Sequence, residues 1–140
     1  MMEWIFWALA SAVFAAATAI FAKLGVSDIG SDMATFLRVL VILPVLALVL
    51  TVTHGWQRVD GIPPRAMVFL GLSGLATGAS WLCYFRALKL GDAARVAPLD
   101  KLSVVFVAVL GTLLLGEKLS GINWAGVALI AFGALLVGWR

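Results

Sequence analysis

Charged side chains are scarce in this chain of 140 residues. They make up 12% of it, against 64% for hydrophobic residues, and the mean hydropathy is +1.12. A soluble domain of this length cannot bury so much apolar surface, which excludes a water-soluble globular fold. The formal net charge is +3 without any run of consecutive Lys or Arg, so we expect no nucleic-acid partner. Dispersed cations of this kind fit loops that rest on anionic lipid headgroups.

Cysteine and histidine, the residues most often used to bind metals, are nearly absent as well. Cys83 is the only cysteine, which excludes an internal disulfide and a cysteine zinc cluster. His54 is the only histidine and has no carboxylate at a useful spacing. The sequence contains no HExxH, GxSxG or phosphate-binding loop motif. We therefore expect no enzyme activity, no metal site and no cofactor.

Long apolar stretches are what the chain does contain. A helix needs about 20 mostly apolar residues to cross a bilayer. The stretches are continuously apolar rather than alternating, which favours helices over a barrel. We predict an all-α membrane protein in contact with the lipid bilayer, a single domain over residues 1–140 with five transmembrane helices. The predicted spans are residues 4–22, 33–52, 66–87, 93–115 and 122–139.

Polar residues and prolines mark the ends and the bends of these helices. Ser31 or Asp32 is expected to cap the second helix. Pro44 and Pro98 lie inside spans, and Pro98 removes the hydrogen bond to the carbonyl of Ala94. Each proline predicts a kink, which is either a tolerated bend or a hinge beside a substrate path.

Hydroxyl and aromatic side chains recur on one face of two spans. In the third span, four hydroxyl-bearing residues follow spacings of four, three and four, which keeps them on one face. The first span carries a mixed stripe of rings and hydroxyls. Such faces suit either a small-molecule cavity or hydrogen bonding between helices. The candidate substrate-binding residues are Trp7, Ser11, Phe14, Thr18, Ser73, Thr77, Ser80, Trp81 and Tyr84.

The few ionisable residues within the spans all fall in the same half of the bilayer when the helices alternate in direction. We predict an intramembrane charge network formed by Lys23, Arg38, Arg86, Asp100 and Lys101. An acid placed beside these cations would be held ionised. The network is either a salt-bridge lock between helices or a cationic vestibule that draws an anionic or polar substrate.

Three pieces of sequence resemble one transporter family. They are residues 80–88 (SWLCYFRAL), 97–106 (APLDKLSVVF) and 113–120 (LLLGEKLS), followed by an apolar, glycine-rich last span. Their order and spacing are similar to those of the EamA group of the drug/metabolite transporter superfamily, over essentially the whole chain. The resemblance implies secondary transport of small metabolites or drugs by alternating access. It also implies a cavity between the first four helices of each repeat. We expect an integral protein of the bacterial cytoplasmic membrane.

The chain holds one five-helix repeat, whereas most members of that family hold two of inverted topology. A single repeat cannot enclose the usual cavity, so we expect a homodimer, and the inverted symmetry favours an antiparallel one. The cations outside the spans are nearly balanced between the two sides, which permits both orientations. Two other functions stay open: a flippase for lipids or lipid-linked sugars, and a non-transporting membrane subunit of a larger complex.

Overall fold

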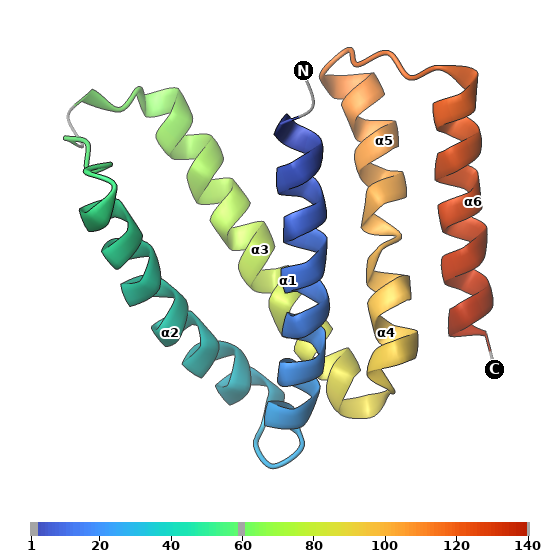
Figure 1. The fold of residues 1–140 in the computed structure, drawn as a ribbon, viewed down its shortest axis with the longest axis horizontal. Coiled ribbons are helices and arrows are strands. Elements are labelled where there is room, and N and C mark those ends of the chain that lie inside the picture. The colour runs from blue at the N-terminus through green and yellow to red at the C-terminus, as the bar shows by residue number, and fades with distance from the viewer. Residues whose placement is uncertain (1–2, 59–60, 140) are drawn as a thin grey trace. The chain divides into compact units, whose positions relative to one another are not determined.

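The computed structural model describes residues 3–58 and 61–139, and the regular elements in these ranges are α-helices (Figure 1). Their bounds are α1 Glu3–Val26, α2 Ser31–Val52, α3 Pro64–Leu90, α4 Ala93–Asp100, α5 Ser103–Leu114 and α6 Gly121–Gly138. Taking α4 and α5 together, five segments are long and apolar enough to cross a membrane. The predicted five-helix membrane fold is therefore confirmed for the described part of the chain.

Several helices extend beyond the apolar stretches that predicted them. The third runs from Pro64 to Leu90 and takes in Arg65 at one end and Lys89 at the other. Hydropathy marks only the part of a helix that suits hydrocarbon, whereas backbone hydrogen bonds continue wherever the side chains permit them. The charged ends of the helices thus extend past the apolar segment.

The fourth span is interrupted. The helix α4 ends at Asp100 and α5 begins at Ser103 (Figure 1). Pro98, inside α4, has no N–H to donate to the carbonyl of Ala94. The N–H of Lys101 is then shared between the carbonyls of Pro98 at 3.0 Å and Ala97 at 3.3 Å, and the shorter bond spans three residues, which tightens the last turn of α4. The bend expected at Pro98 is thus accompanied by a break within the span.

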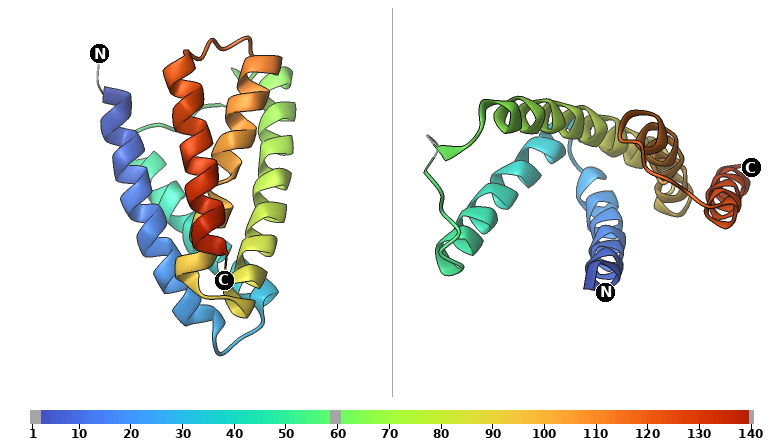
Figure 2. Two further views of the ribbon diagram at one scale, coloured as in Figure 1. Left: turned by 90° about the vertical axis from the view of Figure 1, so that its right-hand side faces the viewer. Right: turned by 90° about the horizontal axis from the view of Figure 1, so that it is seen from above.

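The chain divides into two compact units, residues 1–20 with 90–140 and residues 21–89, and each is described by itself. In the first unit, α4 and α5 both pack against α6. The helices α5 and α6 run in opposite directions and are joined by residues 115–120 (Figure 2). At Gly138 a Cβ atom would lie 2.7 Å from the side chain of Leu99, so the missing side chain lets α6 approach α4 closely.

The second unit consists of the last residues of α1 with α2 and α3. Pro44 lies inside α2 without interrupting it. The two long helices meet near the start of α2 and separate toward the 53–63 connection (Figures 1 and 2). The small core of this unit lies at the end where they meet, and its buried side chains are Ala22, Val26, Ala34, Thr35, Phe85 and Leu88.

The prediction that Ser31 or Asp32 caps α2 is wrong. Gly30 occupies the N-cap position, and the helix has no side-chain cap. The Ser31 hydroxyl donates instead to the Asp32 carboxylate at 3.1 Å. That carboxylate also accepts from the guanidinium of Arg86 on α3, and a hydrogen bond from a charged donor is stronger than one from a neutral donor.

Candidate functional site

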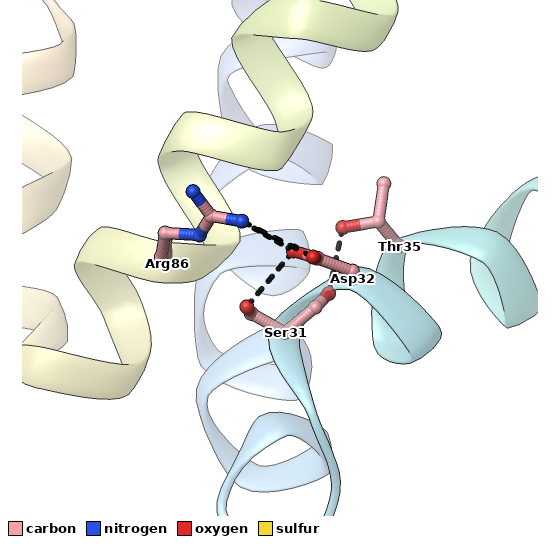
Figure 3. Close-up of polar contacts among 4 residues, drawn as sticks. All are labelled: Ser31, Asp32, Thr35 and Arg86. Carbon is pink, nitrogen blue, oxygen red and sulfur yellow. Dashed lines mark hydrogen bonds and ion pairs between the residues drawn. The ribbon is translucent and has the colours of Figure 1, made fainter.

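An ion pair joins the first turn of α2 to α3. Nη2 of Arg86 lies 3.1 Å from Oδ2 and 3.2 Å from Oδ1 of Asp32 (Figure 3). Ser31 also donates to the Asp32 carboxylate, and the Thr35 hydroxyl donates to the Ser31 carbonyl at 2.9 Å. Asp32 is well placed electrostatically, because the N-terminal turn of a helix favours negative charge.

Two lysines near this ion pair donate to backbone carbonyls. Nζ of Lys23, on α1, lies 2.7 Å from the carbonyl oxygen of Leu88. Nζ of Lys89, on α3, lies 2.5 Å from the carbonyl oxygen of Ile29, in the connection between α1 and α2. Carbonyls in the last turn of a helix lack partners within the helix. Lys23 therefore satisfies one of these groups on α3, and its charge suits the helix C-terminus.

Arg38 is held by aromatic rings. Its guanidinium carbon lies 4.4 Å from the ring centroid of Trp81 and 5.6 Å from that of Phe85. Trp81 and Phe85 are four residues apart and so lie on the same face of α3. A cation over an aromatic face is stabilised by the ring quadrupole, more strongly where water is excluded. Arg38 and Trp81 are both half-buried, and Phe85 is buried.

The structure thus gathers one set of cations at one end of the 21–89 unit. We call this set the cationic end, and its members are Lys23, Arg38, Arg86 and Lys89. The sequence prediction included the first three. It did not pair Arg86 with Asp32, which the sequence analysis treats only as a candidate helix cap.

The two remaining residues of the predicted charge network lie in the other unit. Nζ of Lys101 is 3.3 Å from Oδ2 of Asp100, at the break between α4 and α5. Asp100 is the more sheltered of the pair, with 35% of its side chain exposed against 55% for Lys101. A network that joins the residues of both units stays a prediction.

The hydroxyl stripe of α3 is exposed over most of its length. Ser73, Thr77 and Ser80 are exposed, and Tyr84 is half-buried. Thr77 donates to the carbonyl of Ser73 at 2.8 Å, which is a bond within the helix. These hydroxyls therefore remain available to a neighbour or to water.

The stripe of α1 belongs to the other unit. Trp7 and Phe14 are 70% and 73% exposed, Ser11 is exposed and Thr18 is half-buried. The assignment of both stripes to one substrate cavity stays a prediction.

Comparison with known proteins places this arrangement in a family. The model of the EamA-like transporter family matches residues 2–139. A protein of Sinorhizobium sp., named an uncharacterized transporter in the cobO 3' region, is 66% identical over 135 residues, 96% of each chain. An uncharacterized transporter of Pseudomonas aeruginosa is 30% identical over 86 residues, 61% of this chain and 29% of that protein.

A more distant relative carries a specific name. It is the probable 4-amino-4-deoxy-L-arabinose-phosphoundecaprenol flippase subunit ArnE of Hamiltonella defensa, 23% identical over 86 residues, 61% of this chain and 76% of that protein. No solved structure gives a significant match. The resemblance seen in the sequence is confirmed by the family match and by the five membrane-spanning helices. The chain is an integral membrane protein that belongs to the EamA-like transporter family.

Proposed function

We propose that the chain is a half-size secondary transporter of small metabolites or drugs in the bacterial cytoplasmic membrane. It works by alternating access as an antiparallel homodimer. The observation that carries this proposal is the exposed stripe of hydroxyl side chains on α3. It belongs to a chain that holds a single five-span repeat of a transporter family.

The exposed stripe supports a cavity shared by two copies. Ser73, Thr77 and Ser80 lie along the middle of α3, within a span. Hydroxyls at that depth are costly against hydrocarbon and favourable against another helix or a wet cavity. A second copy placed over this face would cover the stripe and close a cavity lined by it.

The interrupted fourth span supports alternating access. Transporters use discontinuous helices near the substrate because the ends of the half-helices present unpaired backbone groups and allow bending. The break lies beside the Asp100–Lys101 ion pair. Rearrangement of this pair would accompany movement of α4 relative to α5.

Flux in proteoliposomes tests the transport proposal. Purified protein is reconstituted and assayed with a panel of labelled amino acids, labelled organic acids and ethidium. Asp100→Asn and Arg86→Ala are expected to reduce flux while the protein still purifies as a folded species. Arg65→Ala, at the other end of α3, serves as the matched control and keeps its flux. Unchanged flux in both Asp100→Asn and Arg86→Ala would remove the charge network from the mechanism.

Cysteine labelling tests the antiparallel arrangement. Single cysteines are introduced at each terminus in a Cys83→Ser background and labelled in intact cells with an impermeant maleimide. Dual insertion predicts that each terminus is labelled in part of the population. Labelling of each terminus from one side only would exclude the antiparallel homodimer.

A second candidate function is favoured by the relative named as a flippase subunit. In that case the chain moves lipids or lipid-linked sugars, or serves as a membrane subunit of a larger complex. Thermal stabilisation that depends on the lipid headgroup would support the flippase. Co-purification with a stoichiometric partner, without flux by the chain alone, would support the subunit.

A further inference from the structure

We propose that Arg38, held against Trp81 and Phe85, binds one oxyanion group, a carboxylate or a phosphate, of the transported solute. This inference rests on the proposed transport function and gives its substrate class, an organic anion. It concerns a side-chain cluster that lies wholly within the 21–89 unit.

The first argument is how Arg38 is held. The rings of Trp81 and Phe85 lie 4.4 Å and 5.6 Å from the guanidinium carbon. Aromatic rings attract the positive charge but offer no oxygen or nitrogen acceptor to its N–H groups. The cluster therefore fixes the position of the guanidinium while its five N–H donors remain available to a ligand.

The second argument is the contrast with the rest of the cationic end. Arg86 donates to a carboxylate, and Lys23 and Lys89 donate to carbonyls. Arg38 has no hydrogen bond or ion pair to any residue that the structure describes. A half-buried guanidinium with unmet donors is costly inside a membrane, and the cost is relieved when an acceptor arrives.

The third argument is the depth of Arg38 within its membrane span. Arg38 is seven residues after Ser31, the first residue of α2, which places it about 10 Å along the helix.

The ligand class follows from the shape of the side chain. A planar guanidinium can bind a carboxylate or a phosphate through two parallel hydrogen bonds. A lipid phosphate and a solute anion share this chemistry, so the experiment separates the two sources.

Titration of the purified chain in maltoside detergent, without phospholipid, tests the site. Benzoate and inorganic phosphate are added at constant ionic strength, with choline chloride as the reference, and thermal unfolding and tryptophan fluorescence are followed. Saturable stabilisation by at least one of the two anions is expected. Arg38→Gln is expected to weaken the apparent affinity by at least about tenfold, and Arg38→Lys by less, because Lys keeps the charge but not the planar fork.

The matched control is Arg65→Gln. Arg65 also lies near an aromatic ring on α3, 5.8 Å from the Phe69 centroid, but is exposed at the first turn of that helix. Its loss should leave both titrations unchanged. Equal affinity in Arg38→Gln and the unsubstituted chain, or no saturable effect of either anion, would overturn the proposal.

Two further outcomes would also overturn it. If only added phosphatidylglycerol stabilises the protein, and does so through Arg38, the site is a lipid anchor. If the exchange Arg38→Asp with Asp100→Arg restores the stability that Arg38→Asp alone loses, Arg38 is a structural ion-pair partner.

The binding readout is independent of flux. Anion binding without flux therefore counts against the transport proposal, whereas flux of neutral or cationic solutes without anion binding counts against this site.

Discussion

Asp32 and Arg86, which are 54 positions apart in the sequence, form an ion pair with Nη2 3.1 Å from Oδ2. It connects the beginning of one membrane span to the last part of the next. Both side chains are well exposed, 61% for Asp32 and 66% for Arg86, so water and salt reach the pair. The pair lies beside the buried core of the 21–89 unit, so its geometry reports how α2 and α3 are packed against each other.

A double-mutant cycle should find weak coupling between these two residues. Asp32→Asn, Arg86→Gln and the double variant are compared by unfolding of the detergent-solubilised protein. An exposed pair contributes about 0–1 kcal/mol, and we expect a coupling energy in that range. A value above about 2 kcal/mol would mean that the pair is shielded from water in the detergent-solubilised protein.

Lys23→Met should destabilise the protein more than Lys89→Met. Lys23 donates to the carbonyl of Leu88, a fully buried residue, and an unsatisfied buried acceptor costs about 1–3 kcal/mol. Lys89 donates to Ile29 in an exposed connection, where water can replace the lost donor. Thermal unfolding of the two variants measures the difference, and equal losses would contradict this account.

Gly138→Ala should destabilise the packing of α6 on α4. The added Cβ would lie 2.7 Å from the side chain of Leu99, so that side chain must move; because Leu99 is 39% exposed and no backbone atom is in the way, we expect a loss at the low end of the overpacking range, about 1 kcal/mol. Gly126→Ala is the control in the same helix, because nothing lies within 4 Å of its Cβ position. If Gly126→Ala lowers the unfolding temperature as much as Gly138→Ala does, that face of α6 contacts another chain.

Pro98→Ala should make the fourth span more regular. An alanine supplies the N–H that can bond to the carbonyl of Ala94. We expect slower hydrogen exchange around residues 98–102 and reduced proteoliposome flux, because the proposed hinge is stiffened. Unchanged exchange would show that the break is imposed by the surrounding helices, and unchanged flux would separate the break from transport.

Much of the fold follows from the sequence alone. The five spans are visible because lipid requires long apolar helices, and Pro98 marks the helix that is interrupted. The end points were less predictable. The apolar stretch ends before charged residues such as Lys89, whereas the helix α3 continues through Lys89. The cap assigned to Ser31 or Asp32 is wrong because α2 already begins at Ser31, with Gly30 at the N-cap, so both residues lie inside the first turn.

The contacts of the candidate site were harder to foresee. The sequence places Arg38 and Arg86 in the same half of the bilayer, but it does not give the rotation of α2 against α3. That rotation decides that Trp81 and Phe85 lie beside Arg38, while Asp32 lies beside Arg86. Periodicity gives the face of a single helix, whereas the pairing of faces is a property of tertiary packing.

The break between α4 and α5 also has a mechanical consequence. An eight-residue helix such as α4 is about 12 Å long, too short to cross a bilayer alone. Both α4 and α5 pack against α6, which continues without interruption past the break. The last helix therefore restrains the fourth span, because any bending at the break must slide or tilt α4 or α5 along α6. The Leu99–Gly138 contact is where that movement would first be resisted.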